Sequence, residues 1–167
     1  MILYHPAKDI NHCIYRLINL LISIESSIEL DKLRVLDFYY LFPFLIKEIK
    51  PWPSDIKELK SDALKIPNAF EKISNKKRIF FDLSEIQKNA ITTLLAKNLI
   101  QFVNESTKTI SINYEAVPHD FFEISQFDEF LKSHTFSIIT KGLTKTLWNG
   151  KSGLKYRSGL LEYKYDE

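Results

Sequence analysis

The sequence predicts an α+β fold that is mostly helical, and two neighbouring patterns in the 167-residue chain indicate it. Over residues 81–97, apolar side chains recur every three or four positions, which is typical of a helix with one buried face. Over residues 99–114 the period changes to two, which is typical of half-buried strands. A helix followed at once by a two-stranded ribbon indicates the second half of a winged helix. We therefore expect a winged-helix domain over residues 1–147, including an added C-terminal helix, and an extended tail over residues 148–167.

The helix before the ribbon is predicted to begin at Asp82. Aspartate is a good N-cap. Glu85, three residues later, can complete a capping box by accepting a hydrogen bond from the backbone N–H of the cap residue. Phe81 and Ile86 occupy the two positions of a hydrophobic staple. The ribbon that follows would turn at residues 104–108, where polar side chains separate the two alternating segments.

Two further helices are predicted near the N-terminus. Residues 6–25 carry an apolar stripe at helical spacing, and Asp31 is a candidate cap for a second helix. Between residues 35 and 46 only Asp37 and Pro43 are not apolar, so this helix must be buried on most sides. Because proline cannot continue a helix, Pro43 should kink or end it.

The rest of the chain completes the predicted order. A proline-rich connection over residues 50–67 contains Trp52, which should pin it down, and a short helix over residues 68–74 would follow. Ser125 would cap a last helix. The segment 148–167 then combines lysine, arginine and glycine with aromatic side chains.

The composition limits the classes of function. With 45% hydrophobic residues the chain can form a real core, and its net charge of +2 commits it neither to nucleic acid nor to membrane. The single Cys13 excludes an intrachain disulfide and fits a reducing compartment. No signal peptide and no apolar run long enough for a bilayer are visible. We expect a soluble cytoplasmic protein with no membrane partner.

Catalytic chemistry is poorly supported. His5, Asp9 and His12 share one helical face, but no further cysteine or histidine cluster completes a metal site. His134 lies on an apolar stripe, where a packed histidine is expected more often than a catalytic base. Four glycines form no phosphate-binding motif. We predict no catalytic, metal-binding or cofactor-binding residues, and a small hydrolase is only a third alternative.

Binding to nucleic acid is an alternative function. The outer face of the helix before the ribbon offers Lys88, Asn89 and Lys97 together with Glu85, which is a weak electrostatic footprint for reading DNA. A basic cluster precedes this helix, and we interpret it as a solvated turn in preference to a phosphate contact. The basic, aromatic tail is the better candidate, since charge and stacking surfaces occur together in nucleic-acid grooves, and the same composition equally suits a tail that docks on an acidic partner protein. The candidate contacts are Lys76, Lys77, Arg78, Lys88, Lys151, Lys155 and Arg157.

Binding to a partner protein is the remaining class of function. The second helix and the tail hold more aromatic side chains than a small winged helix normally buries, and this composition is typical of interface cores. Core packing of the same side chains is the competing interpretation. The candidate partner-binding residues are Phe38, Tyr39, Phe42, Phe44, Trp148, Tyr156 and Tyr163.

Three segments carry a resemblance to a known family: YHPAKDINHCIYRLINLL, LDKLRVLDFYYLFPFLIKEIKPWP and ALKIPNAFEKI. Together with the helix and ribbon that follow, they resemble the middle component of bacterial ABC three-component systems. This group includes the small subunit of Lamassu-type antiphage systems. The resemblance covers residues 4 to 147, and its motifs are patterns of apolar residues and prolines.

The resemblance implies a winged-helix subunit without activity of its own, encoded with an SMC- or Rad50-like ATPase and an effector, often a nuclease. Such a subunit would couple DNA sensing by the ATPase to the effector, so its own association with DNA would be indirect. The resemblance assigns no catalytic residues to this chain. We therefore expect a non-enzymatic bridging subunit of an antiphage or anti-plasmid defence complex. The alternative is a dimeric winged-helix transcription regulator, whose DNA binding should fall steeply with salt.

Overall fold

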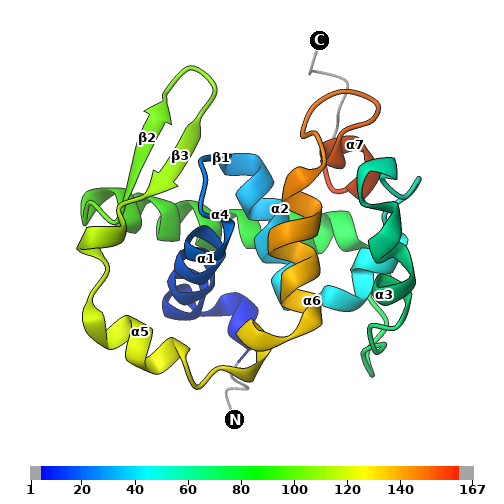
Figure 1. Cartoon of the computed structure of the whole chain (residues 1–167), viewed down its shortest axis with the longest axis horizontal. Helices are drawn as coiled ribbons and strands as arrows, with labels where there is room; N and C mark the ends of the chain where they lie inside the picture. Colours follow the sequence, from blue (N-terminus) through cyan, green and yellow to red (C-terminus); the bar gives the residue numbers. More distant parts are fainter. Residues whose placement is uncertain (1–4, 162–167) are drawn as a thin grey trace.

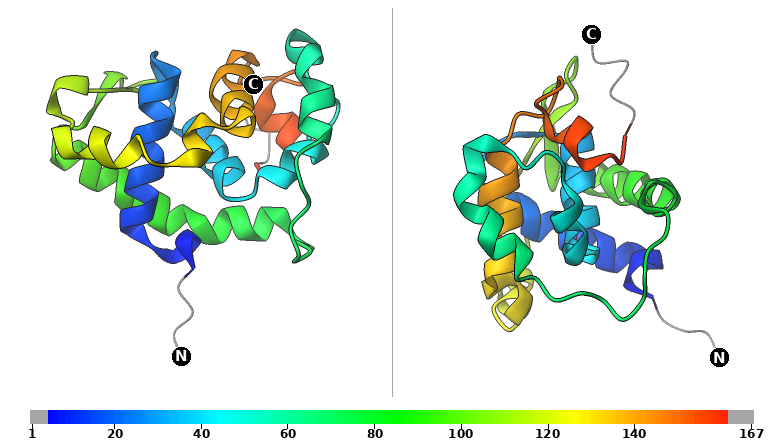
Figure 2. Two further views of the ribbon diagram at one scale, coloured as in Figure 1. Left: turned by 60° about the horizontal axis from the view of Figure 1, so that its bottom comes forward. Right: turned by 90° about the vertical axis from the view of Figure 1, so that its right-hand side faces the viewer.

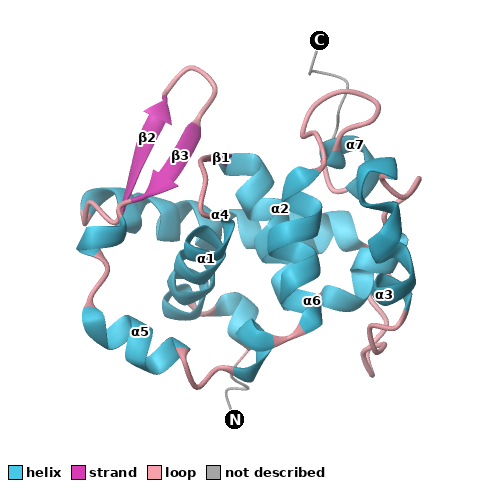
Figure 3. Ribbon diagram, in the orientation of Figure 1, coloured by secondary structure: helices cyan, strands magenta, loops and turns pink. Residues whose placement is uncertain are grey.

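The computed structural model describes residues 5–161 and is a mostly helical α+β fold with one small antiparallel sheet (Figures 1 and 3). The fold class predicted from the sequence is confirmed at this level. Within the described residues, no helix is long and apolar enough to cross a membrane. The helices are α1 (Ile10–Ile24), α2 (Leu30–Leu41), α3 (Lys60–Leu64), α4 (Lys76–Ala96), α5 (His119–Ser125), α6 (His134–Ser137) and α7 (Leu154–Ser158). The strands are β1 (Ile28–Glu29), β2 (Ile100–Asn104) and β3 (Thr109–Ile112).

The predicted ribbon is present as the antiparallel pair β2 and β3. A third strand, β1, lies between α1 and α2 in the chain and pairs with β3, so the sheet order is β1-β3-β2. Ile28 lies opposite Ile110, and both side chains are buried. The sequence gives no sign of β1, because two residues are too few to reveal an alternating pattern.

The core forms where α1, α2 and α4 meet. Helix α4 runs along one side of the molecule and α1 crosses it, as the left view of Figure 2 shows. The predicted first helix is divided: Pro6–Lys8 form a 3-10 turn, and the Asp9 carboxylate then accepts hydrogen bonds from the first backbone N–H groups of α1. Fully buried members of this core include Leu17, Leu20, Leu36, Phe38, Ala90 and Leu94.

Helix α4 begins earlier than predicted. The side chain of Asn75 accepts a hydrogen bond from the backbone N–H of Arg78 and caps the helix, so Asp82 is an exposed residue in its second turn. The predicted staple is therefore wrong, and the Phe81 side chain is 76% exposed. The physical reason is that the apolar stripe continues toward the N-terminus through Phe80, which packs edge-on against Phe38.

Two other predicted helix starts are also wrong. Helix α2 follows Glu29, and Asp31 lies inside its first turn, where it pairs with Arg34 at 2.9 Å. Residues 68–74 form no helix; the short helix α3 precedes them instead. The predicted end of the second helix is correct, because α2 stops at Leu41 and Pro43 opens a 3-10 segment.

The connection after α2 is held by side chains, as expected from its tryptophan. The indole Nε1–H of Trp52 donates to the carbonyl of Ile56 at 2.9 Å. The ammonium of Lys47 donates to the carbonyl of Ile66 at 2.8 Å and to the side chain of Asn68. These bonds fix the segment 47–68, which contains a 3-10 helix (Ser54–Leu59) and α3, against itself.

Ser125 ends α5 and does not cap the next helix, which corrects another expectation. Ser133 is the cap, because its hydroxyl accepts from the backbone N–H of Phe136 at 3.1 Å. Helix α6 then continues into a wider turn (Ile138–Gly142) and a 3-10 turn (Leu143–Lys145). The buried Lys32 of α2 donates to the carbonyls of Thr144 and Thr146 at 2.8 Å each, which ties α2 to this segment.

The described part of the tail, residues 148–161, is not extended. It contains α7, and Trp148, Leu154 and Leu160 are buried in the same hydrophobic core as the rest of the chain. The backbone N–H of Leu154 donates to the carbonyl of Leu147 at 2.7 Å, which closes a loop before α7. These residues therefore complete the core.

Candidate interaction surfaces

A buried ion pair holds α1 against α2 at the centre of the molecule. Nε of Arg16 lies 2.5 Å from Oδ1 of Asp37, a second guanidinium nitrogen lies 3.0 Å from Oδ2, and both side chains are fully buried. Arg16 also donates to the carbonyl of Pro6 at 3.3 Å. Burial opposes the charge on Arg16, but Asp37 outweighs it, so the pKa of Arg16 is raised.

His12 is part of the same network. Its Nδ1 lies 2.6 Å from a guanidinium nitrogen of Arg16, and since arginine can only donate, Nδ1 must be the acceptor of a neutral imidazole. Burial, followed by the positive charge of Arg16, lowers the pKa of His12. Burial also raises the pKa of the neighbouring Cys13 to about 12, so this thiol is not ionised near neutral pH.

Helix α4 joins the network through Gln87. Its Nε2 donates to Oδ2 of Asp37 at 2.9 Å and to the backbone carbonyl of Arg34 at 3.1 Å, while its Oε1 accepts from Nε of Arg34 at 3.1 Å. None of the contacts in this network was expected from the sequence. The available signals were Asp37 within an apolar run and Arg16 within the apolar stripe of the first helix.

His5, Asp9 and His12, whose shared helical face was weighed but not predicted as a metal site, have other partners. The ring of His5 accepts from the backbone N–H of Ala7, Asp9 caps α1, and His12 meets Arg16. Across residues 5–161, no group of three or more histidine, cysteine, aspartate or glutamate side chains is placed to hold a metal ion.

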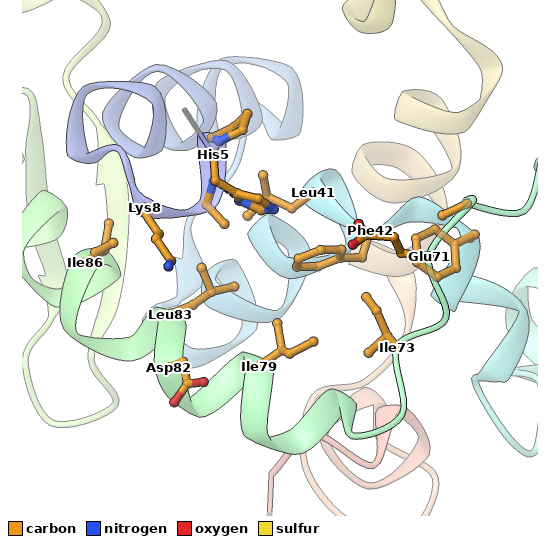
Figure 4. A pocket seen from close by; sticks show the side chains of 14 residues that line it. His5, Lys8, Leu41, Phe42, Glu71, Ile73, Ile79, Asp82, Leu83 and Ile86 are labelled. Atoms are coloured by element: carbon orange, nitrogen blue, oxygen red, sulfur yellow. Dashed lines mark hydrogen bonds between the residues drawn. The ribbon is translucent and has the colours of Figure 1, made fainter. Parts of the chain in front are cut away.

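An open, mostly apolar groove with a volume of about 640 Å³ lies between the end of α2 and the first half of α4 (Figure 4). Phe42 and Phe44 form one wall, and Ile79 and Leu83 of α4 form the opposite side. The charged side chains that line it are Lys8, Glu71 and Asp82. We refer to it as the apolar groove; its remaining lining residues are His5, Pro6, Ala7, Leu41, Ala69, Ile73 and Ile86.

The structure divides the four candidate aromatic residues of the second helix into two pairs. Phe38 and Tyr39 are buried in the core, so core packing, the competing interpretation, accounts for them. Phe42 and Phe44 are half-buried, stand edge-on to each other at 6.5 Å between ring centroids, and line the apolar groove. Partner binding by this second pair stays a prediction.

The tail aromatics also differ. Trp148 is only 8% exposed and belongs to the core, whereas Tyr156 on α7 is 38% exposed. Tyr163 lies outside the described residues. Of the three, Tyr156 is the one that the described structure leaves accessible to a partner.

The seven basic candidates differ in their partners and in their exposure. Arg157 donates to the carbonyls of Pro51 and Ser152, each at 2.6 Å, and thereby ties α7 to the proline-rich connection. Lys76 pairs with Glu48 at 3.5 Å. The remaining candidates show different degrees of exposure: Lys77, Arg78, Lys88 and Lys151 are exposed, and Lys155 is half-buried.

The comparisons with known proteins identify one family. Its description is ABC-three component (ABC-3C) system middle component 5, and its model matches residues 2–166. The match confirms the middle-component resemblance and extends it through most of the tail, while the Lamassu-type subgroup stays a prediction. No curated protein and no solved structure matches the chain. The chain belongs to the family of middle component 5 of ABC-three component systems.

Proposed function

We propose that residues 10–112 form a winged helix. The order α1-β1-α2-α4-β2-β3, with β1 added to the hairpin on the β3 side, supports this assignment. Helix α4 would be the recognition helix of such a domain, and the turn between β2 and β3 would be the tip of its wing. The segment that contains α3 would then be an insertion between the second and the third helix of the motif.

We propose that the protein is a non-enzymatic subunit that bridges an SMC- or Rad50-like ATPase and an effector, such as a nuclease, in a cytoplasmic defence complex. Its membership of a middle-component family is the observation that carries this proposal, since a middle component implies partner subunits. DNA would be sensed by the ATPase, so the association of this chain with DNA would be indirect.

The apolar groove supports a role in binding a partner. The half-buried Phe42 and Phe44 present ring surface that no other described side chain covers completely, and apolar pockets of this kind receive the anchor residues of a partner. Tyr156 offers a second accessible aromatic side chain on α7. We propose that a partner subunit inserts apolar side chains into the apolar groove.

A dimeric transcription regulator is less well supported. Lys88, Asn89 and Lys97 are exposed on α4, as that function requires. However, Asp82 and Glu85 are exposed on the same helix and would repel the phosphates of a duplex that lies along it. A transcription regulator should bind its operator with an affinity that falls steeply as the salt concentration rises. A gel-shift titration measures this affinity.

Co-expression with the neighbouring genes tests the bridging role. Wild-type protein should elute with a long ATPase in size-exclusion chromatography with light scattering. Ala69→Glu places a carboxylate at an exposed position in the apolar groove and should weaken this complex without lowering the melting temperature. Ala96→Glu, at an exposed position of α4 outside the groove, is the matched control and should leave the complex unchanged. A wild-type chain that elutes alone would contradict the proposal.

A further inference from the structure

A second groove lies on the other side of the first half of α4, between this helix and the end of the described chain, with a volume of about 440 Å³. We call it the basic groove, because the charged side chains that line it are all cations: Arg34, Lys77 and Arg78. The apolar side chains Phe81, Leu160 and Leu161 contribute to its walls. It therefore combines positive charge with apolar surface over a short distance.

The cations of the basic groove differ in their partners. Arg34 lies between α2 and α4, where it donates to Asp31, Gln87 and the Ser84 hydroxyl, so it is a fixed part of the floor. By contrast, the exposed side chains of Lys77 and Arg78 have no ion pair or hydrogen bond to any other residue in the range 5–161. Within residues 5–161, no carboxylate therefore neutralises these two charges.

The position of these two cations is unfavourable for the helix itself. Lys77 and Arg78 lie in the first turn of the 21-residue helix α4, where the helix dipole is positive and no acidic side chain compensates. Folding alone would favour acidic side chains there. Phe81, which follows one turn later, is likewise exposed although it is a large apolar side chain. Neither feature stabilises the folded chain, whereas both suit an anionic ligand that has apolar groups.

The chemistry favours an acidic peptide over nucleic acid. Asp82, which lines the apolar groove, and Glu85 are exposed on α4 one and two turns after Arg78, so a phosphate backbone that continued along the helix would meet their carboxylates. A short peptide confined to the groove would avoid them. Its carboxylates could pair with Lys77 and Arg78 while a leucine or an aromatic side chain packed on Phe81.

We propose that the basic groove binds an acidic, apolar-containing peptide segment of a partner subunit. This inference rests on the proposed bridging role and adds a surface and a partner chemistry to it. The apolar groove and the basic groove lie on opposite sides of the first half of α4, so this helix can contact two partner segments at the same time.

Fluorescence anisotropy with the full chain tests the groove. The probe is a labelled hexapeptide, Asp-Glu-Leu-Phe-Glu-Asp, and its neutral counterpart is Asn-Gln-Leu-Phe-Gln-Asn. The acidic peptide should bind, and its affinity should fall as salt is raised. The double variant Lys77→Glu/Arg78→Glu should bind about tenfold more weakly or worse, because two attractive contacts become repulsive. This variant should stay folded, because acidic side chains suit the first turn of a helix.

Lys88→Glu is the matched control, since Lys88 is exposed on the same helix but outside the basic groove, and it should leave peptide binding unchanged. Equal binding of the acidic peptide by wild type and the double variant, or of the acidic and neutral peptides by wild type, would overturn the inference. Two other results would also overturn it: displacement of the peptide by single-stranded DNA whose binding needs Lys77 and Arg78, or self-association of the chain that is lost in the double variant.

Co-expression separates this inference from the proposed function. A wild-type complex that persists unchanged in the double variant overturns the inference and leaves the bridging role intact. Loss of the complex in the double variant, with the Lys88→Glu complex retained, supports both. If wild type forms no complex at all, the bridging role fails, and the peptide titration still decides whether the basic groove binds acidic peptides.

Discussion

Replacing Arg16 with methionine removes one half of the buried ion pair and leaves the Asp37 carboxylate in the core. Methionine fills similar space but cannot donate the two short hydrogen bonds that Asp37 receives from the guanidinium. Gln87 Nε2 and the more distant Cys13 Sγ, at 4.0 Å, would be the donors left to Asp37 within the described structure. An uncompensated buried charge of this kind costs about 3–5 kcal/mol of unfolding free energy.

That loss is large compared with the stability of an ordinary domain, which is about 5–15 kcal/mol. For a chain of this size, 1 kcal/mol corresponds to about 2–4 °C in melting temperature, so Arg16→Met should melt roughly 6–20 °C below wild type. Urea denaturation followed by circular dichroism measures the free energy directly. Lys65→Met is the control, because it breaks the exposed Lys65–Asp62 pair and should change stability little.

A double-mutant cycle isolates the pair itself. Arg16→Met combined with Asp37→Leu removes both charges, and apolar replacements of a buried pair are often neutral or stabilising. The double variant should therefore be more stable than Arg16→Met alone. Two results would refute the reasoning. One is a loss of less than about 1 kcal/mol for Arg16→Met, which is the value of an exposed pair. The other is that Asp37→Leu destabilises the Arg16→Met variant as much as it destabilises wild type.

Three further predictions concern single side chains. The hydroxyl of Tyr39 is buried without a hydrogen-bond partner among the described residues, so Tyr39→Phe should leave stability unchanged or raise it by about 1 kcal/mol in urea denaturation; a clear loss would mean that the hydroxyl has a partner. Trp148→Ala should cost about 3–5 kcal/mol because this side chain is in the core, whereas Tyr156→Ala should cost far less; equal melting of the two variants would contradict this placement. His12 is held neutral by a pKa below its ordinary value of 6.5, so the stability it contributes is complete above about pH 6.5 and is lost as the pH falls towards the lowered value. His12→Gln should therefore show a flatter fall in stability on acidification than wild type, and parallel curves would refute the assignment.

Hydrophobic periodicity predicted much of the fold correctly. The ribbon of β2 and β3, the helical character of the three core helices and the stop at Pro43 all follow from local pattern and backbone chemistry. The helix starts were less predictable, because Asp31, Asp82 and Ser125 are all chemically able to cap. The structure places caps at Asn75 and Ser133, where the turn geometry suits them.

The surfaces were less predictable than the fold. Phe38 and Phe42 are alike in the sequence, yet Phe38 is fully buried whereas Phe42 is half-buried and lines the apolar groove. The ion pair of Arg16 with Asp37 joins residues 21 positions apart, so no local pattern reveals it. Likewise, the basic groove brings the end of the described chain next to α4, which only tertiary structure can do.

Reconstitution with and without this chain tests the bridging role most directly. The neighbouring ATPase and effector would be co-expressed in the presence and absence of the protein and analysed by size-exclusion chromatography with light scattering. The account predicts that ATPase and effector elute together only when this chain is present, with all three in one peak. Elution of ATPase with effector in its absence, or of this chain alone in its presence, would contradict the bridging role.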